Sequence, residues 1–234
     1  MLRRNLLESS YCIPCEMSMF AGIKQDFCKE PLDNQRDLYY DIYRISEGGG
    51  PMKLAVLFPG IGYTNQKPLL YYAGKVAAGQ GYEVLPVDYG HFPRNVKGDA
   101  AKMRQCFESA SAQAEDALRD VVWDAFEDVV FIGKSIGTTV AARYAREHGV
   151  GARLVLLTPL AETFLFTQGS AVAFHGTADP WAATGDIRRL CMEQGVPLHL
   201  TENANHSLET GDVRTDIATL MNTMEIIGRF IREG

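Results

Sequence analysis

The chain has 234 residues, of which 46% are hydrophobic and 22% are charged, and its formal net charge is −6. This composition is typical of a globular chain that can bury a full core, and it excludes fibres, disordered tails and disulfide scaffolds. Nucleic acid is not an expected partner, because phosphate binding needs a basic face and 23 Lys and Arg stand against 29 Asp and Glu.

No apolar run approaches the roughly 18 residues that a membrane-spanning helix needs. Residues 1–10 contain two arginines but no apolar block long enough for a signal peptide. We therefore expect no membrane partner and a cytoplasmic location. The sequence gives no indication of the oligomeric state.

Residues 1–51 do not follow the periodic pattern of the rest of the chain. They hold three of the five cysteines, and Cys12 and Cys15 form a C-x-x-C pair. Zinc needs four ligands and the neighbouring sequence does not complete a set, so we expect no metal site. Two interpretations of this extension stay open: residues 38–45 add an edge strand to the sheet, or the segment is a translated upstream region and the natural chain begins at Met52.

From residue 52 onward, short apolar runs alternate with helical patterns, and turn residues separate them. Strands are predicted over residues 53–58, 83–88, 128–132, 154–158, 171–175 and 197–201. Helices are predicted from residue 68, from an Asp99 N-cap to Val121, and over residues 136–145, 184–194 and 212–231. Alternating strands and helices build parallel sheets. We therefore predict that residues 52–234 form a three-layer α/β/α sandwich with an open, mostly parallel six-stranded sheet.

A G-x-S-x-G motif at residues 133–137 lies between a predicted strand and a predicted helix. A serine on so sharp a turn has a strained backbone, and side chains two residues to either side would collide unless they are glycine, as Gly133 and Gly137 are. The turn projects the Ser135 hydroxyl above the sheet. At the start of the helix, the backbone N–H of Ile136 can donate to a developing oxyanion.

A serine hydroxyl is a weak nucleophile, so it needs a histidine base and a carboxylate that orients the base. Asp179 follows the strand predicted over residues 171–175, and His206 follows the last predicted strand. Both positions lie beyond the carboxyl ends of parallel strands, where open α/β sheets bind ligands. The alternatives are that Asp179 only forms a turn, and that Glu202 or Asp186 is the acid.

Four other histidines compete with His206. His175 and His199 fall within predicted strands and are expected to be satisfied core residues. His148 ends a predicted helix. His91 follows the end of the second predicted strand, where it lines the pocket or lies on the surface.

With these motifs the sequence resembles the α/β-hydrolase superfamily, in its compact form without a lid and close to esterase-like or dienelactone-hydrolase-like members. The resemblance covers residues 52–234. It implies that Ser135 is the nucleophile, Asp179 the acid of a catalytic triad and His206 the general base.

The resemblance also implies a second oxyanion donor just after the first predicted strand. There we expect the backbone N–H of Ile61, with Gly62 as the next candidate. The family more often has His-Gly at the position where this chain has Pro59-Gly60. Trp181 either forms a wall of the pocket or packs beneath its loop, and Lys134 is expected to begin the helix near the site. The residues expected around the substrate are Tyr63, Lys134, Trp181 and His91.

Two nucleotide-binding motifs fail on spacing. A dinucleotide fingerprint that begins at Gly60 would need a third glycine where Asn65 stands. A P-loop that ends at Ser135 would need a glycine where Asp128 opens an apolar strand. We expect no cofactor.

The resemblance implies a serine hydrolase that cleaves a small acyl ester through an acyl-enzyme intermediate. Thioesters, amides, lactones and acyl transfer would use the same residues. A protein that keeps the fold for binding without catalysis is the alternative from another class. The family commonly inserts its lid in the interval that is only residues 159–170 here, so we expect an open, shallow site.

Overall fold

The computed structural model describes residues 52–90, 92–93 and 95–233. The Cys12–Cys15 pair, the edge strand that one of the two interpretations places at residues 38–45, and the candidate pocket residue His91 lie outside these ranges. Within them, strands and helices alternate in the order β1 (Met52–Phe58), α2 (Pro68–Ala78), β2 (Glu83–Pro86), α3 (Ala100–Leu118), η2 (Trp123–Ala125), β3 (Phe126–Lys134), α4 (Ile136–Glu147), β4 (Arg153–Leu157), η3 (Ala161–Leu165), β5 (Ala171–Gly176), α5 (Thr184–Gln194), β6 (Leu198–Thr201) and α6 (Val213–Arg232).

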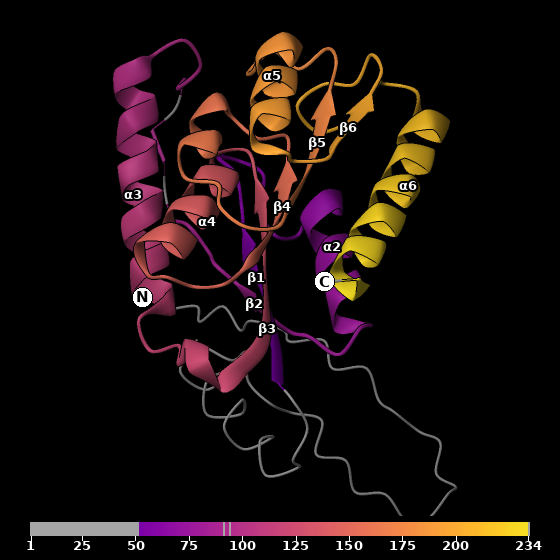
Figure 1. Ribbon diagram of the computed structural model, residues 1–234. Helices are drawn as coiled ribbons and strands as arrows, with labels where there is room; N and C mark the ends of the chain where they lie inside the picture. Colours follow the sequence, from indigo (N-terminus) through magenta and orange to yellow (C-terminus); the bar gives the residue numbers. More distant parts are fainter. Residues whose placement is uncertain (1–51, 91, 94, 234) are drawn as a thin grey trace, which may run out of the picture. The chain divides into compact units, whose positions relative to one another are not determined.

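These strands form one sheet of six strands in the order β2-β1-β3-β4-β5-β6, and every neighbouring pair is parallel. The predicted sheet is confirmed, and in the described residues it is parallel throughout. Since all of these strands run in the same direction, their carboxyl ends lie at one edge of the sheet (Figure 1). The loops that leave this edge are therefore neighbours in space.

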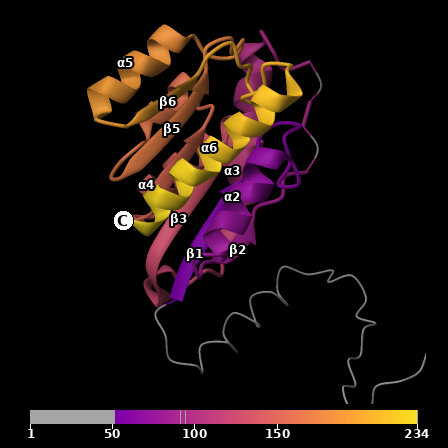
Figure 2. The same ribbon diagram turned by 90° about the vertical axis from the view of Figure 1, so that its right-hand side faces the viewer.

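Helices cover both faces of the sheet, as the three-layer prediction requires. In β1, Leu54 and Val56 pack in the core beneath α3, α4 and α5, while Ala55 and Leu57 pack in the core beneath α2 and α6. Figure 1 shows the two helical layers on opposite sides of the sheet, and Figure 2 shows α6 beside α2 on their shared face. Alternation along each strand thus fills two separate cores.

Two of the helices begin at an aspartate whose side chain caps the helix N-terminus. The Asp99 carboxylate accepts a hydrogen bond from the Lys102 backbone N–H at 3.0 Å, so it caps α3 as predicted. Asp212 caps α6 in the same way, through the Thr215 N–H at 2.9 Å. The prediction that the α3 pattern reaches Val121 is wrong. The helix ends at Leu118, and Val121 packs against the core from the segment that follows.

The connection between β4 and β5 contains only the short η3. In the described part of the chain no additional domain covers the carboxyl edge of the sheet there, in agreement with the lidless form predicted. No helix within the described ranges is long and apolar enough to span a membrane.

Candidate active site

Ser135 lies on the turn between β3 and α4 with φ of 56° and ψ of −125°. Non-glycine residues seldom adopt a positive φ, so the packing around the turn must hold this conformation. A Cβ on Gly137 would collide with the carbonyl oxygens of Phe58 and Pro59, and a Cβ on Gly133 would lie 2.7 Å from the Thr138 Cα atom. Both glycines therefore stand where the sequence argument required them.

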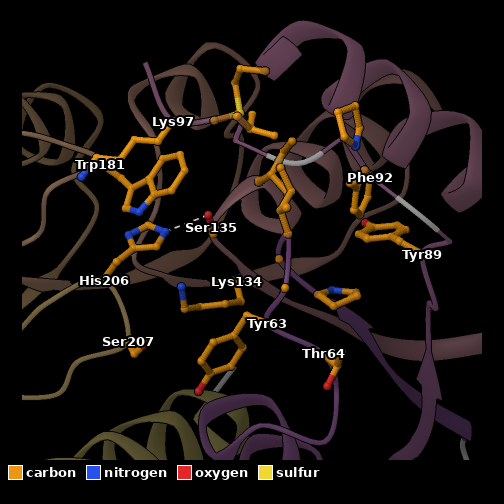
Figure 3. A pocket seen from close by; sticks show the side chains of 18 of the residues that line it. Tyr63, Thr64, Tyr89, Phe92, Lys97, Lys134, Ser135, Trp181, His206 and Ser207 are labelled. Carbon is orange, nitrogen blue, oxygen red and sulfur yellow. Dashed lines mark hydrogen bonds between the residues drawn. The ribbon is translucent and has the colours of Figure 1, made fainter. Parts of the chain in front are cut away.

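The His206 ring joins Ser135 to Asp179. Its Nε2 atom lies 2.8 Å from the Ser135 Oγ atom (Figure 3). Its Nδ1 atom lies 2.6 Å from Asp179 Oδ2. The second Asp179 oxygen accepts the Trp181 backbone N–H at 2.8 Å. The Asp179 carboxylate is fully buried, and both of its oxygens are engaged.

The alternative acids lie elsewhere. Glu202 accepts a hydrogen bond from the Thr177 hydroxyl at 3.2 Å, and Asp186 is an exposed residue of α5 whose carboxylate is 3.9 Å from Arg189. Of the three candidate acids, Asp179, Glu202 and Asp186, only Asp179 contacts the His206 ring.

Close backbone contact fixes the Asp179 loop against the His206 loop. The Ala178 N–H donates to the Ala204 carbonyl at 2.9 Å. A Cβ on Gly176, the last residue of β5, would collide with that same carbonyl. Glycine at this position therefore lets the two loops approach each other.

The His206 loop is also ordered from within by Asn205. Its side-chain oxygen accepts the backbone N–H groups of Ser207 at 2.7 Å and Glu209 at 3.3 Å. Its own backbone N–H donates to the Glu209 carbonyl at 2.8 Å. Asparagine side chains stabilise turns in this way, and here the turn presents the histidine ring to Ser135.

The loop after β1 is a tight turn that packs against Ser135. Gly60 and Tyr63 exchange backbone hydrogen bonds at 2.9 and 3.3 Å, which leaves Ile61 and Gly62 at the centre of the turn. Gly62 has a φ of 71°, which this position of a type II turn requires. A Cβ on Gly60 would lie 3.3 Å from the Ser135 Cβ, so this turn is in contact with the sharp turn between β3 and α4 that carries Ser135, called the elbow below.

The three predicted oxyanion donors line the same pocket as Ser135. Among the described residues, the amides of Ile61, Gly62 and Ile136 make no backbone hydrogen bond that would occupy them. Each N–H remains available to an oxygen bound beside the serine.

A pocket of about 860 Å³ opens in front of Ser135 and His206. Its walls come from the loop after β1, the segment between β2 and α3, the elbow, and the loops that carry Trp181 and His206. Three of the four predicted substrate-binding residues line it, namely Tyr63, Lys134 and Trp181 (Figure 3).

No protein-family model matches the sequence, and a search of the curated proteins finds no match. Solved structures do match. An esterase from Pyrococcus furiosus aligns over 79% of this chain and 84% of its own with 14% identity and a TM-score of 0.57. A serine hydrolase without lid from Xanthomonas campestris aligns over 78% and 82% with 13% identity and a TM-score of 0.53. Est1E from Butyrivibrio proteoclasticus, with ferulic acid bound, aligns over 80% and 91% with 14% identity and a TM-score of 0.57.

The chain adopts the α/β-hydrolase fold. At these identities the likeness establishes the fold and not the activity. Within the α/β-hydrolase fold observed here, Ser135 follows β3, the Asp179 loop follows β5 and the His206 loop follows β6.

Burial and hydrogen bonding set the charges of the His206–Asp179 pair. Burial lowers the pKa of His206, the hydrogen bond to Asp179 opposes this effect, and the positive charge of Lys134 adds to it. Burial alone would raise the pKa of Asp179, but the hydrogen bonds from the His206 ring and the Trp181 amide outweigh it and lower the pKa. A neutral imidazole beside an ionised carboxylate is the state that a general base requires.

Lys134 is the last residue of β3 and not the first residue of a helix, which corrects the sequence expectation. It is 1% exposed, and its ammonium nitrogen lies 4.8 Å from the centre of the Tyr63 ring. Burial lowers the pKa of Lys134 to about 7 and raises the pKa of Tyr63 to about 12. Lys134 therefore lines the pocket from the end of a β-strand, immediately before the sharp turn at Ser135.

Trp181 belongs to the pocket wall, which decides between the two placements that the sequence left open. Its ring centre lies 5.7 Å from that of His206, and the ammonium of Lys97 lies 5.8 Å from the centre of the indole. Sequence reasoning missed Lys97 and the neighbouring wall residues Tyr89 and Phe92. The carboxyl end of the second strand could have indicated Tyr89, but no motif marks Lys97.

The other described histidines lie outside the Ser135–His206 contact. His175 is fully buried, which confirms its predicted place in the core. Only one ring nitrogen has a hydrogen-bond partner, Thr184 Oγ1 at 3.2 Å, so the expectation that the ring is fully satisfied is wrong. His199 is half-buried and stacks on Phe174, and His148 is exposed beside Glu115. Within the described ranges, no group of three or more His, Cys, Asp or Glu side chains could hold a metal ion.

Proposed function

We propose that this protein is a serine hydrolase that cleaves a small acyl ester, with Ser135 as nucleophile, His206 as general base and Asp179 as the acid of the triad. The observation that carries the proposal is the hydrogen-bonded series from Ser135 Oγ through the His206 ring to Asp179, with separations of 2.8 and 2.6 Å.

In the first half of the reaction, Ser135 Oγ attacks the acyl carbonyl while its proton passes to His206 Nε2. The Asp179 carboxylate stabilises the imidazolium that forms. The backbone N–H groups of Ile136 and Ile61, with Gly62 as a further candidate, donate to the oxyanion. The alcohol then leaves with the proton from His206, and the acyl group remains on Ser135.

In the second half, water attacks the acyl-enzyme while His206 Nε2 takes one of its protons. The second tetrahedral intermediate uses the same backbone donors. It collapses to release the carboxylic acid, and Ser135 Oγ recovers its proton from His206. No cofactor enters either half.

The surroundings of Ser135 support a small or exposed acyl substrate. The pocket has a volume of about 860 Å³, and the short β4–β5 connection leaves it without a cap domain in the described residues. Tyr63, Lys134 and Trp181 would contact the substrate. Thioesters and lactones contain the same electrophilic carbonyl and fit the same chemistry.

A fluorophosphonate probe tests the proposed nucleophile, because it reacts with an activated serine and not with an ordinary hydroxyl. We expect the full chain to be labelled at Ser135 and the Ser135→Ala variant to remain unlabelled. Ser170→Ala, which changes an exposed serine ahead of β5, is the matched control and should be labelled like the parent protein. A folded parent protein that resists the probe would instead support a binding protein without catalysis.

A panel of short acyl esters, thioesters, amides and lactones then identifies the bond that is cleaved. We expect hydrolysis of short esters that is lost in Ser135→Ala. Adding alcohols as competing acceptors separates hydrolysis from acyl transfer, since a transferase would form a new ester in preference to the free acid.

A further inference from the structure

Lys134 carries a buried ammonium group that takes no part in the proton transfers of the proposed reaction. Its side chain is 1% exposed, yet in the described part of the chain its nitrogen takes part in no hydrogen bond and no ion pair. The nitrogen instead lies over the face of the Tyr63 ring, 4.8 Å from the ring centre. A cation–π contact attracts the charge but accepts none of the three N–H groups of an ammonium.

The two carboxylates whose charges act on this ammonium, Asp179 and Glu209, form no ion pair with it. Asp179 uses one oxygen for the His206 ring and the other for the Trp181 N–H. Glu209 is an exposed residue whose charge acts on Lys134 only through space. A buried charge without a counter-ion is costly, so an arriving anion of suitable size would be stabilised there.

The pocket is where such an anion would arrive. Lys134 lines it immediately before Ser135 in the chain, and Figure 3 shows its side chain ending on the same side of the pocket as His206 and Ser207. Lys97 brings a second ammonium to the rim beside Trp181. Asp88, the one carboxylate among the described residues that line the pocket, accepts a hydrogen bond from the Asn65 side chain at 3.1 Å.

We infer that Lys134 forms a carboxylate-binding subsite, and that the substrate is an ester that also carries a free carboxylate. A carboxylate fits better than a phosphate, because a single ammonium balances one negative charge and a phosphate dianion calls for several converging donors. The inference rests on the proposed hydrolase function and specifies its substrate class.

The subsite has a pH signature of its own. Burial lowers the pKa of Lys134 to about 7, while the negative charges of Asp179 and Glu209 act in the opposite direction. The His206 ring and the Tyr63 ring are the other titratable groups that face it. Because the ammonium is present below its pKa and lost above it, preference for an anionic ester is expected to fall between pH 6 and pH 9.

The test compares kcat/KM for matched esters with and without a carboxylate. One pair is 4-nitrophenyl hydrogen adipate and 4-nitrophenyl hexanoate, which differ on the acyl side. The other is 4-acetoxybenzoate and 4-acetoxybenzamide, which differ on the leaving group. At pH 6.5 we expect the anionic member of at least one pair to be favoured. The ratio within a pair cancels the titration of His206, since both esters need the same base.

Lys134→Met keeps the length and volume of the side chain and removes the charge. We expect it to reduce the anionic-to-neutral ratio of kcat/KM by roughly 10- to 100-fold, the size of a lost hydrogen bond to a charged group, and to abolish the pH dependence of the ratio. Lys75→Met is the matched control, because Lys75 also lies over a tyrosine ring, at 5.5 Å, but on the exposed surface of α2. It should leave the ratio unchanged.

A binding measurement separates failure of the subsite from failure of the proposed function. In the Ser135→Ala protein, calorimetry with monoethyl adipate and diethyl adipate should show tighter binding of the half-ester, and adding Lys134→Met should remove the difference. That result supports the subsite even if no ester is hydrolysed. Equal binding of the two adipates, or an anionic-to-neutral ratio that Lys134→Met leaves unchanged, overturns the subsite and leaves a hydrolase of neutral esters.

Discussion

The Nδ1 atom of His175 lies 3.7 Å from Asp179 Oδ2, the same oxygen that accepts the hydrogen bond from His206. His175 is fully buried at the end of β5, and burial lowers its pKa below the usual value of 6.5. The Asp179 carboxylate therefore faces a second imidazole from within the protein core, and burial favours the neutral form of that ring.

The buried state of His175 predicts a loss of stability in mild acid. In the unfolded chain His175 binds a proton near pH 6.5, whereas in the folded protein its pKa is lower. The free energy of unfolding is therefore highest above pH 6.5 and falls as the pH drops below this value. One such histidine contributes a slope of at most about 1.4 kcal/mol per pH unit. Denaturant unfolding between pH 7.5 and 5 should show a smaller slope for His175→Phe, and an unchanged slope would contradict the prediction.

The charge of Lys134 should also appear in the pH–rate profile of a neutral ester. Burial is the main cause of the lowered His206 pKa, and the Lys134 ammonium adds to it. Removing that charge eases protonation of the ring, so Lys134→Met should move the acid limb of kcat/KM to higher pH. Lys97→Met should move it the same way by less. If the acid limb of kcat/KM is unchanged in Lys134→Met, the Lys134 charge does not affect the pKa of His206.

The choice of Asp179 over the other carboxylates can be tested by three matched substitutions. Asp179→Asn should reduce kcat roughly 10⁴-fold with little change in fold, because the amide cannot stabilise the imidazolium and favours the wrong tautomer. Asp186→Asn and Glu202→Gln alter exposed carboxylates that do not contact His206, and both should retain activity. Loss of activity in either of these two variants would reassign the acid.

The elbow predicts a sharp difference between two glycine-to-alanine changes. In Gly137→Ala the new methyl group overlaps the carbonyl oxygens of Phe58 and Pro59, which are backbone atoms and cannot move aside as a flexible side chain would. We expect the free energy of unfolding to fall by about 3 kcal/mol and probe labelling of Ser135 to be lost. Gly185→Ala, in α5, meets nothing within 4 Å and should stabilise the protein by about 0.5 kcal/mol in the same denaturant assay.

Residues 1–51 are proposed to be dispensable. Residues 52–233 contain the whole of the sheet described here, together with the elbow and the residues that line its pocket. A chain that begins at Met52 should therefore keep its thermal unfolding transition and its reaction with the fluorophosphonate probe. Failure of this shortened chain to fold would show that the extension belongs to the domain.

Most of the architecture could be predicted because its determinants are local. Each strand is an apolar run bounded by turn residues, and Asp99 and Asp212 mark helix starts that the structure confirms. The end of α3 was harder to place, since Val121 keeps the apolar spacing after the helix has stopped at Leu118.

The parts of the site that escaped prediction depend on contacts between distant segments. Ser135 and His206 belong to motifs, so their meeting could be foreseen. Lys97 reaches Trp181 across two loops of irregular backbone. The burial of Lys134 depends on where Tyr63 packs, and a lysine in isolation suggests a solvated position.

Ser135 and His206 are 71 residues apart in the sequence, and the strand order sets β4 and β5 between β3, which leads to the serine, and β6, which leads to the histidine. Among the described strands, β6 lies at the edge of the sheet and pairs with β5 alone, so the other strands can pair before β6 is in place. Helices and the central strands can be in place while Ser135 still lacks its contact with His206. During refolding, recovery of Ser135 reactivity toward the fluorophosphonate probe should therefore lag behind recovery of helical circular dichroism. The rate of probe labelling then reports when β6 pairs with the rest of the sheet.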